Sequence, residues 1–320
     1  MPTVIQRDIV ARELIRKYPA LKINIGEGHE GWSVKIFDKI KNDLKKKKQF
    51  QHKRKLCDSS KNLLEYPAKN IKHLPVTDIS DEKRKLIENE KETMFQEMSK
   101  PPSNRYSAII EQALKKTFND RRRLIESNIP LGELKKEYPA LFTVTGMYYD
   151  FKVAYNIDLQ KTFLNNLASC SPGIIKYAHK KKINDLLTTE EDDNNINYRI
   201  IQVALILPLI FEEKPDYIYK KYPVEATLDN LQDVPVTPHL SIIGDPFTSS
   251  EVYVVAENIT LIDCSNFIEG ISILLGLYFV ANIAYPKEAI FTYKFLEYYI
   301  LKFPCKKIPR KLLTLSKFLS

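Results

Sequence analysis

The sequence predicts a mainly α-helical protein whose C-terminal part is an α+β domain with a small antiparallel β-meander. Over most of the chain, apolar residues recur every three or four positions, which is the spacing of helices that bury one face. Between residues 239 and 264 the period changes, and three short β-branched segments alternate with turn residues, as in antiparallel strands. With 320 residues, 44% of them hydrophobic, the chain is long enough for about two or three domains.

Two helices are expected at the beginning of the chain, over residues 7–18 and 31–48. The first ends at Tyr18, because the proline that follows, Pro19, disfavours helical geometry in the residue before it. The second carries an apolar stripe on one side and lysines on the others. We therefore expect residues 1–46 to form a small basic helix-loop-helix unit.

Residues 47–104 are expected to be a charged, flexible linker. The segment is rich in Lys, Glu, Asn and Ser, is interrupted by prolines and has few apolar residues. Within it, residues 81–98 carry a broken apolar stripe, which indicates a helix that is either transient or docked on another part of the chain.

A helical block is expected over residues 105–165, with a long helix at 108–127. This helix carries three consecutive arginines, Arg121 to Arg123, which cannot all face one groove. One or two of them are placed to contact phosphate, and the others are expected to face solvent or to pair with Glu126. The tetrapeptide YPAL occurs twice, at residues 18–21 and 138–141. Four identical residues are too few to indicate a duplication, so we interpret YPAL as a helix stop that is used twice.

The remaining residues, 166–320, are expected to form the C-terminal α+β domain. Residues 198–211 are apolar on all sides, which predicts a buried helix with a bend at Pro208. The apolar stretch 270–285 falls short of the roughly 20 residues that a membrane-spanning helix needs, so we expect a buried core helix there. A further helix is expected to begin at Pro286, since proline is favoured at the first helical position.

Three groups of motifs resemble a known family. They are KYPALK with EGWSVKIFDKIKNDLKK, then LKKTFNDRRRLI with EYPALF, and finally HLSIIGDPFTSSEVYVVAENITLIDC running into LLGLYFVANIAYPKEAIFTYKFLEYY. Their order resembles that of the sterile alpha motif domain-containing protein 3-like proteins and their transposon-associated relatives, although no sterile alpha motif is recognised in this sequence. The resemblance implies an architecture and a transposon-associated origin. It implies no enzymatic reaction, and it offers no catalytic residues that could be assigned to this chain.

The net charge of +9 is concentrated at one end of the chain. Residues 1–56 contain fifteen Lys and Arg against six Asp and Glu, whereas the two kinds balance in the rest of the chain. Such an asymmetry indicates a polyanionic partner for the N-terminal end.

The densest part of this charge is KKKKQFQHKRK, residues 45–55, with seven Lys and Arg in eleven residues. Lysines that neutralise phosphates release counterions, which gives binding without sequence preference, and the same cluster fits a nuclear localisation signal. The alternative is a solvated linker without a partner. The predicted nucleic-acid-binding residues are Lys35, Lys39, Lys41, Lys45, Lys46, Lys47, Lys48, Lys53, Arg54 and Lys55.

Trp32 either stacks on a base or, as we favour, anchors the small N-terminal unit.

Catalytic, metal and cofactor signatures are not recognised in the sequence. The four cysteines and five histidines lack metal-ligand spacing, and neither glycine-rich nucleotide-binding motif occurs. Asp245 and Asp263, at the ends of expected strands, are the only carboxylates placed like those of a two-metal site. A turn accounts for Asp245 and the start of a helix for Asp263, so we predict no cofactor, no metal and no catalytic residue.

Together these observations predict a non-enzymatic nuclear protein of transposon-associated type. It is expected to bind nucleic acid or chromatin through the basic N-terminal unit. The C-terminal domain is expected to bind a protein partner or a second copy of the chain, and no association with a membrane is expected. One alternative is a cytoplasmic protein-interaction scaffold in which the basic residues bind nothing. Another is a degenerate transposon-derived enzyme.

Overall fold

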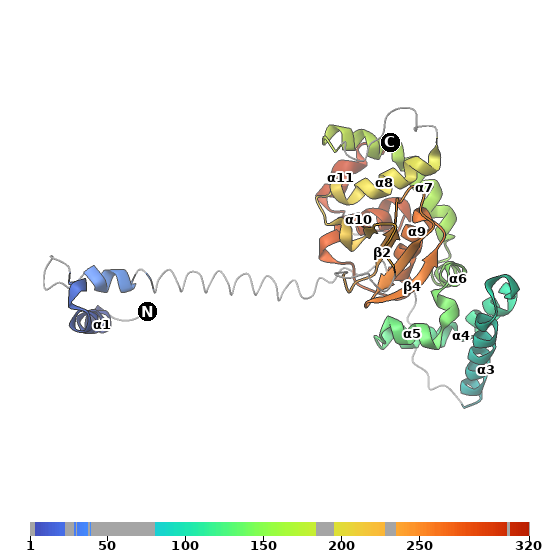
Figure 1. Cartoon of the computed structure of the whole chain (residues 1–320), viewed down its shortest axis with the longest axis horizontal. Helices are drawn as coiled ribbons and strands as arrows, with labels where there is room; N and C mark the ends of the chain where they lie inside the picture. The colour runs from blue at the N-terminus through green and yellow to red at the C-terminus, as the bar shows by residue number, and fades with distance from the viewer. Residues whose placement is uncertain are drawn as a thin grey trace. The chain divides into compact units, whose positions relative to one another are not determined.

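A computed structural model of the chain describes residues 4–22, 29, 31–37, 39, 81–183, 195–227, 235–305 and 308–319. The chain divides into two compact units, Met1–Leu64 and Glu65–Ser320 (Figure 1). The fold is mainly α-helical, with one small sheet in the C-terminal region, as the sequence predicts.

The N-terminal unit contains α1 (Val4–Lys17), the short 3-10 helix η1 (Pro19–Leu21) and helical backbone over residues 31–37. Helix α1 ends before Pro19 as expected, and Tyr18 leaves helical geometry with φ −133° and ψ 79°. The indole Nε1 of Trp32 donates a hydrogen bond to the carbonyl oxygen of Leu21 at 2.7 Å. Trp32 therefore ties the second helix to η1.

The larger unit begins with a helical hairpin. Helices α3 (Asp81–Ser99) and α4 (Ser107–Glu126) pack against each other, with η2 (Pro102–Asn104) in the turn between them. The structure differs here from the expected flexible linker, because residues 81–104 are folded. The apolar stripe of α3 is incomplete by itself, but Met94 is fully buried in the core that α4 completes.

Three more helices and a second YPAL turn follow. Their bounds are α5 (Leu131–Glu137), η3 (Pro139–Phe142), α6 (Val144–Tyr155) and α7 (Leu159–Lys180). Thr143 caps α6 by accepting a hydrogen bond from Gly146, and Asp158 caps α7 by accepting one from Lys161. Tyr138 has φ −136° and ψ 68°, nearly the geometry of Tyr18, so YPAL forms the same helix stop twice.

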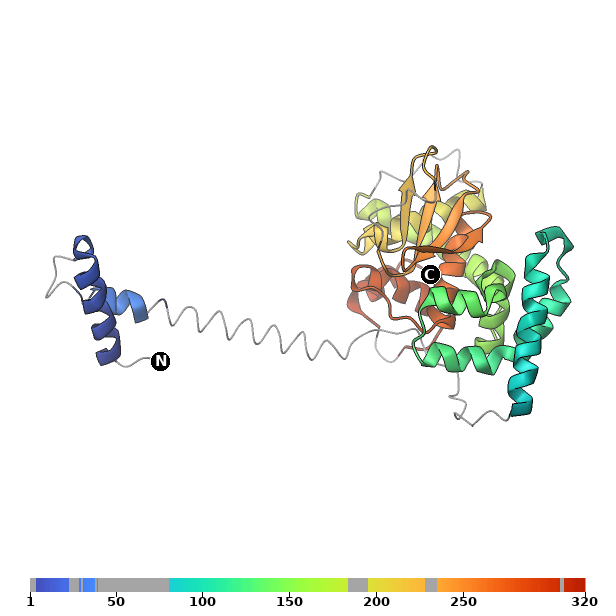
Figure 2. The same cartoon turned by 60° about the horizontal axis from the view of Figure 1, so that its bottom comes forward.

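The sheet has four strands in the order β1-β2-β3-β4, and their bounds are β1 (Tyr219–Tyr222), β2 (His239–Ile243), β3 (Val252–Ala256) and β4 (Ile259–Cys264). Strands β2, β3 and β4 are antiparallel, as predicted. A fourth strand that was not predicted, β1, pairs parallel to β2, so the sheet seen in Figure 2 is mixed. Its sequence, YKKY, lacks the apolar alternation that identifies a strand.

Helices α8 (Ile196–Ile210) and α9 (Phe267–Val280) form the centre of the core. Helix α9 contacts β2, β3 and β4 as well as α6, α7 and α8. Every residue of α9 from Gly270 to Val280 is buried, and α8 is buried over most of its length, with Pro208 inside it. A Cβ atom on Gly270 would lie 2.8 Å from Cγ1 of Val252, so glycine permits the close approach of α9 to the sheet.

The chain closes with short helices that cover the other side of this core. They are η7 (Lys287–Ala289), α10 (Ile290–Phe295), the π-helical turn η8 (Leu296–Ile300) and α11 (Arg310–Ser316), while η5 (Pro215–Tyr217) leads into β1. Among the described residues, no helix is both long enough and apolar enough to cross a membrane.

Candidate nucleic-acid interface

Two of the predicted nucleic-acid-binding residues lie in the described part of the N-terminal unit. Lys35 and Lys39 are both exposed, and they lie at helical positions in the same part of the chain as Trp32. The Lys35 ammonium lies 4.7 Å from the centre of the Trp32 indole ring, which is a cation–π distance. The other predicted residues, Lys41, Lys45, Lys46, Lys47, Lys48, Lys53, Arg54 and Lys55, lie outside the described residues.

Helix α1 adds basic side chains to the same unit. Arg16 and Lys17 occupy its last turn, where cations are favoured by the helix dipole. Both are exposed, and Arg16 forms a 2.9 Å ion pair with the exposed Glu13, a contact of little energetic weight in water. Arg7, in contrast, lies over the ring of Phe37 at 4.4 Å and helps to hold the unit together.

Trp32 is half-buried in this arrangement. Its Nε1 is engaged by the Leu21 carbonyl, and the ammonium of Lys35 is close to its ring. Both contacts support the interpretation of Trp32 as an anchor of the unit rather than as a base-stacking residue.

Two of the three consecutive arginines of α4, Arg121 and Arg122, are buried and cannot contact phosphate, so the expectation that the arginines not on phosphate face solvent was wrong for both of them. Arg121 is fully buried and pairs through Nε and Nη2 with both carboxylate oxygens of Asp150, the first contact being 3.1 Å. Arg122 is also buried, and its Nη1 donates to the carbonyl oxygen of Val280. Only Arg123 is half-exposed, and it pairs with Asp120 at 2.7 Å.

A buried polar network continues from these arginines. The hydroxyl of Tyr138 donates to Asp120 at 2.5 Å, and Nη1 of Arg121 donates to the hydroxyl of Thr117 at 2.6 Å. The Lys91 ammonium lies 2.9 Å from Glu137 and 3.9 Å from Asp120. Burial raises the pKa of the Tyr138 hydroxyl well above its usual range, which keeps it a neutral donor. The network thus joins α3, α4, α5 and, through Asp150 of the buried ion pair, α6.

The sequence signal for this network was present but incomplete. Asp150 lies within the apolar segment MYYDFKVAY, and a carboxylate in such a segment indicates a buried partner. The partner could not be identified, because Arg121 is 29 residues away along the chain.

Asp245 and Asp263, the two carboxylates considered as metal ligands, lie in a turn and on a strand. Asp245 accepts a hydrogen bond from the Phe247 amide at 3.0 Å, which confirms its place in a turn. Asp263 is exposed on β4 opposite Tyr253, whereas Asn266 caps α9 instead. Among the described residues, no three His, Cys, Asp or Glu side chains converge as metal ligands would.

Comparison with known proteins identifies the helical hairpin and its continuation. Residues 87–143 match the family model of the sterile alpha motif domain-containing protein 3, helical domain. The chain resembles sterile alpha motif domain-containing protein 3. The human protein of that name is 24% identical over 200 residues, which are 59% of this chain and 36% of the human protein. No solved structure matches the chain.

The resemblance predicted from the motifs is thereby confirmed. The segment that matches the helical domain of sterile alpha motif domain-containing protein 3 runs from within α3 to the residue after η3. It contains Lys91, Asp120, Arg121 and Tyr138, so most of the buried polar network belongs to it. The matched region of the human protein is about a third of its length.

Proposed function

We propose that this protein is a non-enzymatic nuclear protein, of transposon-associated type, that binds the phosphate backbone of nucleic acid or chromatin through its N-terminal unit. The observation that supports the proposal is the charge asymmetry. Fifteen Lys and Arg against six Asp and Glu lie between residues 1 and 56, and the rest of the chain is neutral. A positive potential at one end favours encounter with a polyanion and makes the binding sensitive to salt.

Part of the positive charge of the N-terminal unit is exposed to solvent and can contact phosphates. Lys17, Lys22, Lys35 and Lys39 are all exposed on the N-terminal unit. Lysines that reach solvent in this way neutralise phosphates one by one, and each contact releases condensed counterions. Binding of this kind carries no base specificity, because the base edges are not read.

The second part of the proposal is that the C-terminal domain binds a protein partner or a second copy of the chain. Support comes from large apolar side chains that its surface leaves exposed, among them Val224, Val236 and Leu313. Exposed apolar residues of this kind are common on surfaces that bind other proteins, although single ones occur on any protein.

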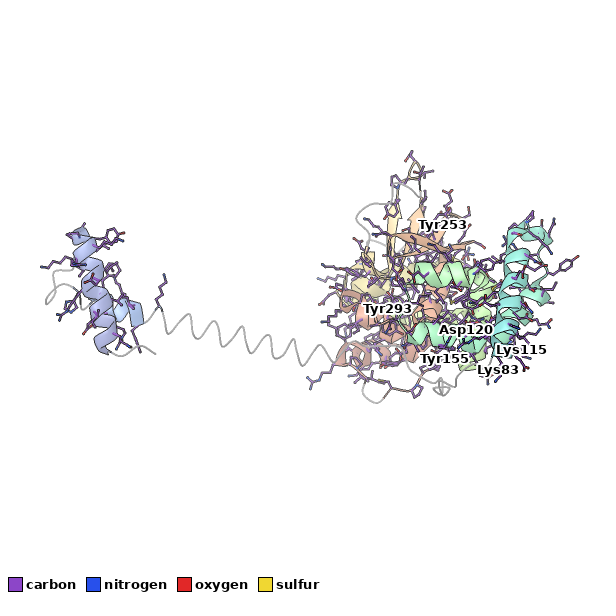
Figure 3. The ribbon with its side chains drawn as sticks, turned by 90° about the horizontal axis from the view of Figure 1, so that it is seen from below. Lys83, Lys115, Asp120, Tyr155, Tyr253 and Tyr293 are labelled. Atoms are coloured by element: carbon purple, nitrogen blue, oxygen red, sulfur yellow. The ribbon has the colours of Figure 1, made fainter. Side chains whose placement is uncertain are left out.

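The test uses the full-length chain and a fluorescent 30-base-pair duplex at increasing salt. We expect binding at low salt, and we expect changing Lys45 to Lys48 to Gln to reduce the slope of log affinity against log salt by about 3 to 4, one unit for each lost phosphate contact. A matched control removes the same charge elsewhere, by changing Lys83, Arg84, Lys85 and Lys115 to Gln. These four are exposed on the α3–α4 hairpin, from which Lys83 and Lys115 extend (Figure 3), and the control is expected to leave the slope nearly unchanged.

Two results would contradict the proposal. Equal losses in both variants would show that only the net charge matters, and no binding at low salt to duplex DNA, duplex RNA or a single strand would remove the nucleic-acid function altogether. In the second case a cytoplasmic scaffold becomes the better description. The N-terminal unit supplies a reason for that alternative, because Ile9, Val10 and Tyr18 are each at least half exposed and apolar. A fluorescent fusion with and without the Lys45 to Lys48 changes measures the nuclear localisation directly.

A further inference from the structure

A cavity of about 400 Å³ lies between α6, α7, α8, the start of α9 and the loop after β2. It is far from the basic unit in sequence and takes no part in the proposed phosphate contacts. Its volume is within the range of small-molecule sites, roughly 300–1,000 Å³. Ten residues line it: Tyr148, Gln160, Leu164, Asn197, Ile201, Phe247, Asn266, Ile268, Glu269 and Ser272.

Apolar side chains form one wall of this cavity. Leu164, Ile201 and Ile268 supply aliphatic surface, and Phe247 supplies an aromatic ring. The Phe247 ring is held in place by stacking on Tyr198, with 4.2 Å between the ring centres and 24° between the planes. A flat apolar group in the cavity would therefore meet a fixed ring and aliphatic side chains.

The polar groups of the lining are positioned by the fold. The hydroxyls of Tyr148 and Ser272 are 2.8 Å apart, and that of Ser272 donates to the Glu269 carbonyl oxygen. The Tyr148 hydroxyl remains protonated because burial raises its pKa far above neutral. The side-chain amides of Gln160 and Asn197 are at exposed positions of the lining, where they can reach a bound molecule.

The one carboxylate among the described lining residues, that of Glu269, favours a positively charged ligand. Among the ten described residues that line the cavity, Glu269 is the only ionisable one besides the neutral Tyr148, and none is Lys, Arg or His. One oxygen of Glu269, Oε2, accepts a hydrogen bond from the Ser265 amide at 2.7 Å. The other, Oε1, makes no hydrogen bond to any of the described residues, so it can accept one from a ligand. A phosphate or a carboxylate would meet no cationic side chain among these ten residues, whereas an ammonium group would meet a carboxylate.

We propose that this cavity binds a small organic cation, namely an ammonium group carried on a flat apolar body. The ammonium pairs with Glu269, and the apolar body packs against Phe247 and the aliphatic wall. The site is independent of the nucleic-acid function, because none of its residues belongs to the N-terminal unit. It can therefore be present whether or not the chain binds phosphate.

Three indole compounds that differ only in one terminal group test the proposal on the full-length protein. They are tryptamine, tryptophol and indole-3-propionate, with an ammonium, a hydroxyl and a carboxylate respectively. Saturation-transfer NMR titrations give their dissociation constants. We expect tryptamine to bind about tenfold more tightly than tryptophol, the difference that a charge-assisted hydrogen bond makes, and indole-3-propionate to bind more weakly than either.

Two variants and one control locate the binding. Glu269→Gln keeps an oxygen for the Ser265 amide and is expected to bring tryptamine to the affinity of tryptophol. Asn197→Trp places a bulky side chain at an exposed position of the lining and is expected to block all three compounds. Glu257→Gln is the matched control, since the Glu257 carboxylate also accepts backbone hydrogen bonds at the start of a helix, from Leu131 and Gly132, but does not line this cavity.

The proposal is overturned if none of the compounds binds saturably, or if the three bind alike. It is also overturned if Glu269→Gln leaves the preference for tryptamine unchanged while the variant's thermal unfolding matches that of the wild type. A loss of preference in Glu257→Gln as well would show a general charge effect and would equally remove the assignment to this cavity.

Discussion

Arg121 and Asp150 form an ion pair whose side chains are 0% and 1% exposed, inside a core of apolar residues. The guanidinium meets both oxygens of the carboxylate and also donates to Thr117, so its hydrogen-bonding groups are largely satisfied. A paired and hydrogen-bonded charge is tolerated in a core, but a charge left alone there is not. The pair therefore makes the packing of α4 on α6 dependent on both residues together.

This relationship predicts that either single substitution destabilises the protein more than the double substitution does. Arg121→Met or Asp150→Leu alone is expected to lower the free energy of unfolding by about 3–5 kcal/mol, because each leaves one uncompensated buried charge. The double variant is expected to recover most of that loss, since two apolar residues can fill the same space. Urea unfolding of the four proteins measures the cycle. Arg123→Met is the control, because its half-exposed pair with Asp120 is expected to contribute only ~0.5 kcal/mol.

The two YPAL turns provide a second comparison within one chain. Tyr18 and Tyr138 have nearly the same backbone geometry, but Tyr18 is half exposed and Tyr138 is fully buried with its hydroxyl on Asp120. Tyr138→Phe is expected to cost about 1–3 kcal/mol of unfolding free energy, because the buried carboxylate loses a donor. Tyr18→Phe is expected to change stability by less than about 0.5 kcal/mol, as for most surface positions. A comparable loss in both variants would show that the turn, not the burial, determines the effect.

Much of the fold could be predicted because helices and strands are patterned locally. The buried helix α9, the antiparallel strands β2 to β4 and the helix stops before Pro19 and Pro139 all follow from neighbouring residues. Strand β1 could not be found in this way, since YKKY becomes a strand only because β2 offers it hydrogen bonds. Helix α3 likewise depends on α4 for the burial of its apolar face.

The candidate functional residues also differ in whether a local sequence pattern could predict them. The exposure of Lys35 and Lys39 agrees with the amphipathic pattern from which they were chosen, and phosphate binding remains a prediction. The burial of Arg121 and Arg122 could not be predicted, because a basic run is usually solvated and nothing nearby in the sequence indicates the partner of Arg121. The cavity beside Glu269 draws on five separate elements, and no local pattern brings them together.

The close contact at Gly270 gives a third prediction. A methyl group there would lie 2.8 Å from Val252 and 3.3 Å from Leu240, both of which are fully buried in the sheet. Gly270→Ala is expected to lower the free energy of unfolding by about 1–3 kcal/mol, the usual cost of overpacking a core, although alanine is the better helix former. Chemical denaturation measures this, and an unchanged or higher stability would show that α9 can shift away from the sheet at no cost.

His239 predicts how stability depends on pH. The residue is fully buried on β2, and its Nδ1 lies 2.9 Å from the carbonyl oxygen of Thr237, so the ring is a neutral donor with Nδ1 protonated. Burial lowers the pKa of this imidazole below its ordinary value. The unfolded chain therefore takes up a proton below about pH 6.5 that the folded chain does not, and this contribution to stability falls as the pH decreases from there toward the folded-state pKa. Above pH 6.5 the contribution is fully present.

The measurement is the difference in unfolding free energy between the wild type and His239→Leu from pH 8 to pH 5, which cancels the contributions of the other ionisable groups. Leucine has no proton to take up, so the variant is expected to lose less stability than the wild type as the pH falls, with a limiting difference in slope of about 1.4 kcal/mol per pH unit for one proton. His179→Leu serves as the control, because His179 is in the last turn of α7, outside the sheet. Parallel curves for the wild type and His239→Leu would show that the imidazole is protonated as readily in the folded sheet as in the unfolded chain, and the buried, neutral state argued for β2 would then be incorrect.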